Sequence, residues 1–134
     1  MVVERHGSVG PWEATVGYSR VVRAGAHVWV AGCTAAGEDG AVLGGDDPGA
    51  QAAAAIAAIE RALLTVDAAL MDVVRTRIFL TDIAHWEAVG RAHGARFAGV
   101  RPVATMVAVS ALIDPRLLVE IEADAYVADG TSAR

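Results

Sequence analysis

The sequence predicts an α+β domain in which a single mixed β-sheet carries two helices on one face. Several segments in which apolar residues recur at every second position predict strands. Two longer segments with apolar residues at helical spacing each lie between predicted strands. The resulting order is strand–strand–helix–strand–helix–strand–strand. We expect the two strand–helix–strand units to be right-handed crossovers that place both helices on the same side of the sheet.

The first third of the chain predicts a β-hairpin. Residues 2–4 predict a short edge strand, and Gly10-Pro11 marks a turn after it. Residues 18–23 alternate, and Gly25-Ala26 forms a tight turn into a second strand over residues 27–32. This second strand ends at a glycine, which often marks a close approach of another group to the backbone.

The middle of the chain predicts a helix, a strand and a second helix. The first helix is expected over residues 49–70, where Asp46 or Asp47 can cap it and Pro48 lies near its first turn. A strand over residues 72–80 follows. The second helix is expected over residues 85–98, with the spacing of one packed face at Trp86, Val89, His93 and Phe97.

The last third predicts two strands joined by a short turn. The first strand covers residues 103–109, and Asp114-Pro115 stops the pairing before the second strand over residues 118–127. In the second strand, apolar residues alternate with Glu120, Glu122 and Asp124. Three acids on one face repel each other, so water, a subunit contact or a ligand must relieve them. Arg75 and Arg77, on the preceding predicted strand, are expected to form ion pairs with this acidic strand.

The sheet face away from the helices would be bare in a single copy of the chain, and an exposed apolar face of that size predicts self-association. Its expected lining consists of Tyr18, Trp29, Ala104, Met106 and Ala108.

Composition narrows the class of protein. The chain has 134 residues and a net charge of −5 without a basic block, so we expect no nucleic-acid partner. A single cysteine cannot form an intrachain disulfide, and neither a signal peptide nor a membrane span is visible, so a cytoplasmic location is expected. The histidines have no metal-ligand spacing, and we expect no metal and no cofactor. Residues 1–134 are expected to form one domain, with a disordered tail over residues 128–134.

The last third also resembles the signature of the Rid family, the YjgF-like reactive-intermediate and imine deaminases. That signature runs Pro, small, Arg, small, apolar positions, Leu, and a closing apolar-Glu-Ile. The matching residues are Pro102, Val103, Thr105, Val107, Leu112 and Val119-Glu120-Ile121, whereas Ala104 holds the Arg position. Gly10-Pro11-Trp12, the 28–32 strand end and the 74–82 segment extend the resemblance over nearly the whole chain.

The resemblance implies a chorismate-mutase-like, YjgF-type fold that assembles as a homotrimer. The bare sheet faces would then form a trimeric barrel around the threefold axis, with ligand pockets between subunits. It also implies hydrolysis of small enamines and imines to a keto acid and ammonia. In such enzymes the signature Arg holds the substrate carboxylate, and a Glu in the final strand positions the attacking water.

Carried over residue by residue, the resemblance gives a candidate site in which Glu120 is the catalytic acid. Tyr18 and Gly32 match pocket residues, Ala31 replaces a Ser, Met106 replaces a frequent Cys, and Gly90 stands where some members have Asn. The remaining candidate substrate-binding residues are Cys33, Ala104 and Thr105.

The missing Arg leaves two function classes open. Loss of one bidentate contact costs about 2–4 kcal/mol of binding, so an enzyme of this kind would take an atypical substrate. A neutral substrate or an arginine from elsewhere would satisfy this reading, with Arg101 expected to face the opposite side from Ala104. The alternative is a non-catalytic small-molecule-binding or regulatory trimer, because Ala31 and Ala104 both remove polar groups. RNA cleavage ranks last, since the chain is acidic and lacks a His or Lys constellation.

Overall fold

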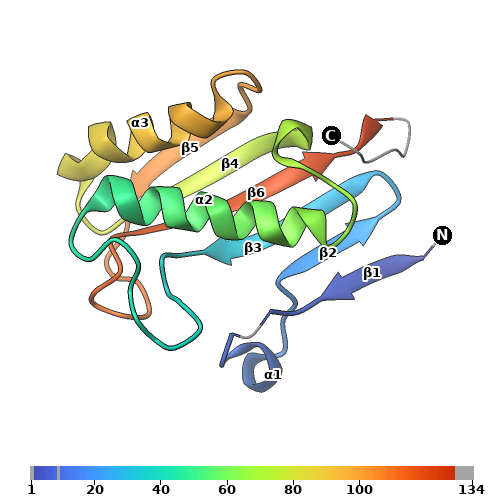
Figure 1. Ribbon diagram of the computed structural model, residues 1–134, viewed down its shortest axis with the longest axis horizontal. Coiled ribbons are helices and arrows are strands. Elements are labelled where there is room, and N and C mark those ends of the chain that lie inside the picture. The colour runs from blue at the N-terminus through green and yellow to red at the C-terminus, as the bar shows by residue number, and fades with distance from the viewer. Residues whose placement is uncertain (1, 9, 129–134) are drawn as a thin grey trace.

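A computed structural model describes residues 2–8 and 10–128 of the chain (Figure 1). Within this part, six strands form one mixed sheet, and the expected α+β class is confirmed. The elements in chain order are β1 (Val3–His6), α1 (Glu13–Val16), β2 (Val21–Ala24), β3 (His27–Cys33), α2 (Pro48–Leu64), a 3₁₀ turn (Leu70–Asp72), β4 (Val73–Leu80), a second 3₁₀ turn (Ile83–His85), α3 (Trp86–Phe97), β5 (Val103–Ala108) and β6 (Val119–Tyr126).

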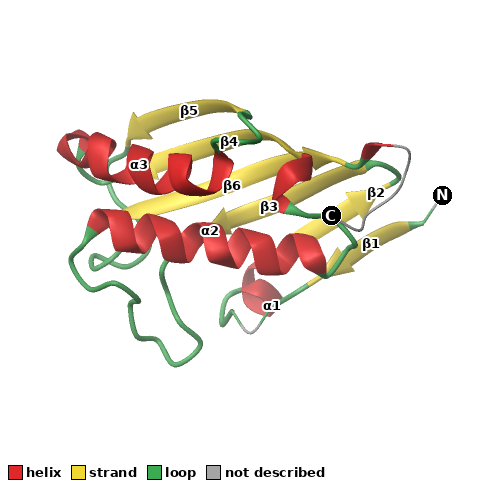
Figure 2. Ribbon diagram, turned by 45° about the horizontal axis from the view of Figure 1, so that its top comes forward, coloured by secondary structure: helices red, strands yellow, loops and turns green. Residues whose placement is uncertain are grey.

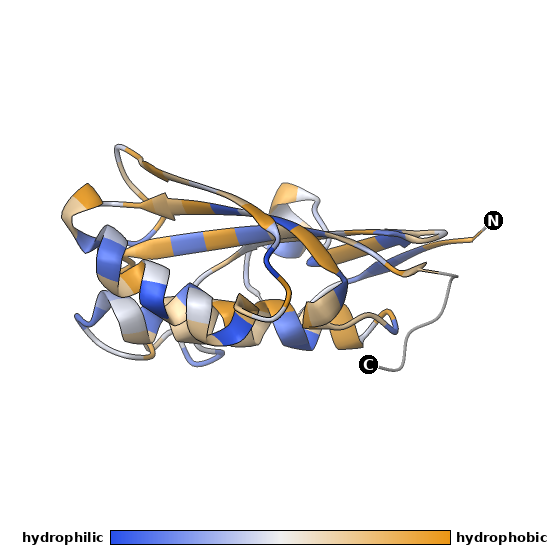
Figure 3. Cartoon of the chain, turned by 90° about the horizontal axis from the view of Figure 1, so that it is seen from above, coloured by the Kyte–Doolittle hydropathy of each residue, from blue (hydrophilic) through white to orange (hydrophobic). Residues whose placement is uncertain are grey.

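The strands lie in the order β1-β2-β3-β6-β4-β5. Only β4 and β5 pair in parallel, and the other neighbours are antiparallel. The last strand therefore lies in the middle of the sheet, between the two strands that flank α2 in the chain. Figure 2 shows α2 and α3 side by side over the sheet, and in Figure 3 both lie on the same side of it.

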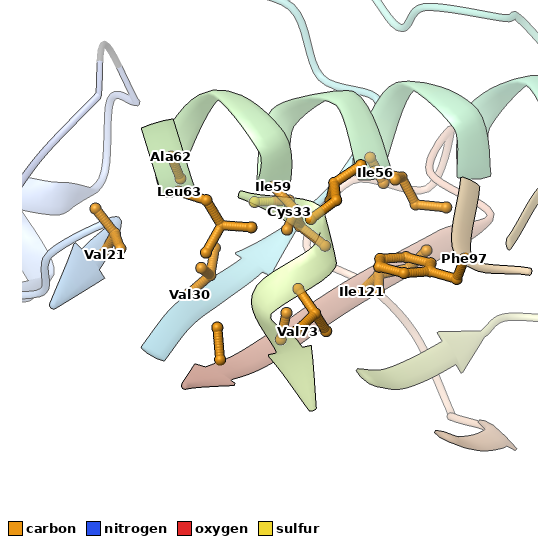
Figure 4. Close-up of a cluster of buried hydrophobic side chains, with 14 of the residues drawn as sticks. Val21, Val30, Cys33, Ile56, Ile59, Ala62, Leu63, Val73, Phe97 and Ile121 are labelled. Carbon is orange, nitrogen blue, oxygen red and sulfur yellow. The ribbon is translucent and has the colours of Figure 1, made fainter. Parts of the chain in front are cut away.

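The core fills the space between the sheet and these two helices. Ile56, Ile59 and Leu63 of α2 are fully buried against it, together with Phe97 of α3. Figure 4 shows Cys33 at the end of β3 beneath α2, within this cluster. The sulfhydryl group thus serves as a small apolar filler on the helix side of the sheet.

Local signals explain where the helices begin and end. The Asp47 carboxylate accepts hydrogen bonds from the backbone N–H groups of Gly49 and Ala50 at 3.0 and 3.2 Å, so Asp47 rather than Asp46 is the N-cap of α2. This helix ends at Leu64, six residues before the expected end at residue 70. The chain turns at Asp67, whose φ of 58° is left-handed, and aspartate tolerates that region better than most residues. In α3, Val89 and Phe97 are buried as expected, but Trp86 is exposed and does not belong to the packed face.

The sheet face without long helices carries the acids of β6, and the alternation expected over this strand is confirmed. Val119, Ile121, Ala123 and Ala125 are buried, while the intervening acids are half-buried. Trp29 is exposed on the same open face, opposite Asp124.

The prediction that Ala104, Met106 and Ala108 of β5 line the bare sheet face is wrong. Ala104, Met106 and Ala108 pair in register with Thr76, Ile78 and Leu80, which are buried under the helices. Met106 accordingly packs against the core rather than lining the bare face. Residues paired directly across two strands point to the same side of the sheet. Val103, Thr105 and Val107 therefore take the open face instead.

Two further expectations from the sequence concern a membrane span and the C-terminal tail. Among the described residues, no helix has both the length and the apolar character needed to span a bilayer. Apart from Ala128, the tail expected to be disordered lies outside the described residues.

Candidate functional site

A cavity of about 370 Å³ opens at one end of the open sheet face. It brings together segments that are far apart in the chain: the α1 region, the end of β3, the loop before β6, and β6 itself. Four of its residues were expected from the sequence, namely Tyr18, Ala31, Gly32 and Glu120. Trp12, Val16 and Ile113 complete the lining. The lining is largely apolar, and Glu120 contributes its one charged side chain among the described residues.

A glycine within a β-bulge of β3 leaves room for the Glu120 side chain. Val30 pairs with Ala123 and Cys33 pairs with Ile121, so the two residues Ala31 and Gly32 oppose a single position of β6. A Cβ on Gly32 would lie only 2.8 Å from Glu120 Cδ and 3.0 Å from Cγ. A glycine is therefore required here for the carboxylate to lie across the strand.

The three acids of β6 have different partners on the adjacent strand. Arg77 lies 3.3 Å from the Glu122 carboxylate and 3.4 Å from that of Asp124, and Arg75 lies 3.9 Å from Asp124. The expected pairing of these arginines with the acidic strand is thus confirmed. Glu120 instead faces Phe79, and among the described residues its carboxylate has neither an ion pair nor a hydrogen bond.

This environment raises the pKa of Glu120 above its ordinary value of 4.5. Burial is the main cause, because a half-buried carboxylate loses hydration. The Arg20 guanidinium opposes the shift, and the neighbouring Glu122 adds to it. A carboxyl group that ionises nearer to neutral pH is better suited to exchange protons with a substrate or a water molecule.

Arg20 connects Tyr18, on the α1 side of the cavity, to the bulge residues Ala31 and Gly32 of β3. Its backbone carbonyl accepts a hydrogen bond from Ala31 N–H at 2.9 Å, and its Nη1 donates to the Gly32 carbonyl at 2.5 Å. Its Nη2 donates to the Tyr18 hydroxyl at 3.4 Å, and the guanidinium carbon lies 5.6 Å from the centre of the Tyr18 ring. The side chain is largely buried, so these contacts fix the bulge and one aromatic wall together.

A buried carboxylate on α1 balances the charge of Arg20. Glu13 lies 3.6 Å from Arg20 Nε and accepts hydrogen bonds from the Ser8 N–H at 2.8 Å and the Ser8 hydroxyl at 2.6 Å. Although burial alone would raise the pKa of Glu13, these hydrogen bonds and the arginine lower it below 4.5 overall. A Cβ on Gly7 would lie 2.6 Å from Glu13 Oε1, so the turn closes tightly around this ion pair.

The other expected site residues do not line the cavity within one chain. Cys33 is buried in the core, where burial raises the pKa of its thiol. Gly90 lies on α3 on the helix side. Ala104 and Met106 also belong to the helix side, and Thr105 lies on the open face of β5, separated from β6 by β4.

Four residues of this region were not expected from the sequence: Trp12, Val16, Arg20 and Ile113. Trp12 follows the Gly10-Pro11 turn signal, but nothing in its spacing indicates a cavity wall. Arg20 had no signal, because its partners lie at positions 13, 18, 32 and 33 and meet only through the hairpin. Among the described residues, no group of three or more His, Cys, Asp or Glu side chains is arranged to hold a metal ion.

Comparisons with known proteins agree on one family. Residues 11–127 match the family model described as endoribonuclease L-PSP. The chain is 40% identical over 124 residues to an uncharacterised protein from Streptomyces coelicolor, covering 92% of both chains.

Solved structures give the same result. Rv2704 from Mycobacterium tuberculosis, described as a member of the YjgF/YER057c/UK114 family, is 50% identical with a TM-score of 0.85, covering 94% of this chain and all of that one. A Rid-family protein of unknown function from Yersinia pestis is 26% identical with a TM-score of 0.82, again covering 94% of this chain and all of that one.

Proposed function

Since the chain belongs to the endoribonuclease L-PSP family, which includes the YjgF/UK114 and Rid proteins, we propose that it is a small-molecule hydrolase that converts an imine or enamine to a carbonyl compound and ammonia. One observation carries this proposal. Glu120 lines the cavity, the pKa of its carboxyl group is raised, and it has no ion-pair partner among the described residues. The other two acids on its face are each paired with arginine.

The proposed reaction uses Glu120 first as a base and then as an acid. The carboxylate takes a proton from a water molecule while the water oxygen bonds to the imine carbon. The carboxyl group then returns the proton to the nitrogen, which gives a carbinolamine. Glu120 next takes the hydroxyl proton and passes it to the same nitrogen, so that the carbon–oxygen double bond forms as the carbon–nitrogen bond breaks and ammonia leaves. An enamine enters this sequence as its imine tautomer. The atoms balance with water as the only co-reactant.

We further propose that a homotrimer completes the site. The side chain of residue 104 points to the helix side of its own sheet, whereas Glu120 points to the open face. Ala104 is exposed on the edge strand β5, so this position is able to contact the cavity of another copy but not that of its own chain. The exposed Trp29, Val103 and Val107 on the open face support the same assembly.

The test measures breakdown of imines that are generated in place by a flavin-dependent oxidase. Semicarbazide traps the remaining imine, so hydrolysis lowers the yield of trapped product. We expect Glu120→Gln to lower the rate by about 10²- to 10⁴-fold, the usual contribution of a general base. Glu122→Gln is the matched control, because it removes an acid from the same strand face outside the cavity lining. An unchanged rate in Glu120→Gln would exclude the proposed role.

A second candidate function is a non-catalytic binding trimer. The apolar character of the lining favours it, since Ala31 has no hydroxyl and Ile113, Val16 and Trp12 offer no catalytic group. This candidate predicts that small ligands raise the unfolding temperature while no imine in a broad panel is hydrolysed. Hydrolysis of any panel member that depends on Glu120 would exclude it.

RNA is not the substrate we propose, although the matching family model carries the name endoribonuclease. The chain has a net charge of −5, and electrostatic attraction to phosphates dominates the affinity of nucleic-acid-binding proteins.

A further inference from the structure

We infer that the cavity selects small ligands with a positive charge, such as an iminium ion or a protonated amine, over ligands of similar size that carry a carboxylate. The inference rests on the proposed function for its choice of site and names the substrate class of that site. Its test measures binding alone.

The lining itself favours a cation. Glu120 is its one charged side chain among the described residues, and Trp12 and Tyr18 add two aromatic rings. Aromatic rings and a carboxylate together attract cations, because the face of a ring carries negative potential. Val16 and Ile113 supply apolar contact for the remainder of a small ligand.

The arginines near the cavity are already occupied by carboxylates. Arg20 lies against Glu13, whose lowered pKa keeps that carboxylate ionised, and its Nη1 donates to the Gly32 carbonyl. Arg116, close to Ile113 in the chain, lies 2.8 Å from the Asp114 carboxylate and donates to the carbonyl of Gly40.

The arginines of β4 are engaged in the same way. Arg75 and Arg77 pair with Asp124 and Glu122. Each of these arginines therefore has a carboxylate partner of its own. Glu120 has neither an ion pair nor a hydrogen bond among the described residues, and the only arginine that acts on it through its charge, Arg20, is already paired with Glu13. A ligand carboxylate would face the charge of Glu120 without a free guanidinium in the lining that this chain supplies, whereas a ligand cation would supply the missing partner.

This selection fits the proposed chemistry. A protonated imine is a stronger electrophile than the neutral form, since its carbon carries more positive charge. The carboxylate that attracts the iminium ion would also take the proton from the attacking water. The products are then the carbonyl compound and ammonium, with charge and atoms balanced.

The test compares three probes that share one ring: cyclopentylammonium, cyclopentanol and cyclopentanecarboxylate. Binding is measured at pH 8 on the full chain by calorimetry and by NMR shifts of the Trp12 indole. We expect cyclopentylammonium to bind at least about tenfold more tightly than cyclopentanecarboxylate, which corresponds to about 1.4 kcal/mol. Cyclopentanol should fall between them.

Two variants locate the effect. Glu120→Gln should abolish the preference for the cation, and Glu122→Gln should keep it, since that acid is paired with Arg77. Equal or tighter binding of the carboxylate by the unmodified protein would overturn the inference whatever the variants do. Cation preference that survives in Glu120→Gln would also overturn it. Because the readout is binding, a cation-selective cavity that hydrolyses nothing would refute the proposed function and leave this inference intact.

Discussion

Replacing Gly32 with alanine would place a methyl group where the Glu120 side chain now lies. Gly32 does not have a positive φ, so its backbone conformation suits an L-residue and the conflict is purely one of space. The nearest carbon of the Glu120 side chain, Cδ, lies 2.8 Å from the added Cβ, whereas ordinary contact begins at 3.4 Å. The carboxyl carbon must therefore move by at least about 0.6 Å, and the carboxylate oxygens must move with it.

Such a movement should affect activity much more than stability. A misplacement of about 1 Å between reacting groups can lower a rate by about 10²-fold, so we expect a loss of this order in kcat/KM for imine hydrolysis. Glu120 is able to rotate away from the methyl group, and alanine restricts the unfolded chain more than glycine does. We therefore expect the free energy of unfolding to change by less than about 1 kcal/mol.

The assay combines imine hydrolysis with urea unfolding of the same variants. Gly94→Ala is the matched control, because a Cβ there meets no atom within 4 Å and the residue lies in the helix α3, far along the chain from the cavity residues. In a Glu120→Gln background, Gly32→Ala should cause no further loss, since its effect passes through that carboxylate. Full activity in Gly32→Ala, or an additive loss in the double variant, would refute the reasoning.

Three other predictions concern the groups around the cavity. Arg20→Met should lower the free energy of unfolding by about 2–4 kcal/mol in urea titrations, because it removes the arginine that pairs with buried Glu13 and donates to the Gly32 carbonyl. Arg20→Lys should recover only part of this stability, and a loss below about 0.5 kcal/mol in Arg20→Met would contradict the prediction. The raised pKa of Glu120 predicts that the hydrolysis rate is full above that pKa and falls as pH drops through it, so the acid limb should lie above pH 4.5; an acid limb at or below that value would contradict the assignment. A raised carboxyl pKa also means that ionisation of Glu120 opposes folding as pH rises through the folded-state value, so Glu120→Gln should unfold at the same or a higher temperature than the unmodified protein at pH 8, and at a lower temperature only if this sign is wrong.

The sequence predicted elements with one dominant period well. The strict alternation of β6 identified its buried and half-buried faces, because a period of two leaves no other arrangement for a central strand. The acids of that strand and the arginines of β4 were correctly expected to meet. The core helix α2 was also expected, although its end at Leu64 depends on a left-handed turn at Asp67 that no helical pattern reveals.

The sequence failed where local patterns carried no contrast. Neither face of β5 carries a charge, with Val103, Thr105 and Val107 on one side and Ala104, Met106 and Ala108 on the other, so alternation could not say which side meets the helices. The helix α1 has only four residues, too few to show a period. Its role in walling the cavity depends on the contact between Glu13 and Arg20, two residues that give no sign of each other in the chain.

The pairing of β6 with β4 means that a single substitution outside the cavity wall could inactivate this site during evolution. Along β4, the sequence Arg75, Arg77, Phe79 presents two cations and then an aromatic ring to successive acids of β6. Glu120 is available only because the third position breaks the series. Replacing Phe79 with arginine would add a third ion pair between β4 and β6, with Glu120, without changing any residue of the cavity wall. Relatives of this chain could therefore keep every residue of the cavity wall and still lack activity. The residue to compare among them is the one on β4 that pairs with Glu120.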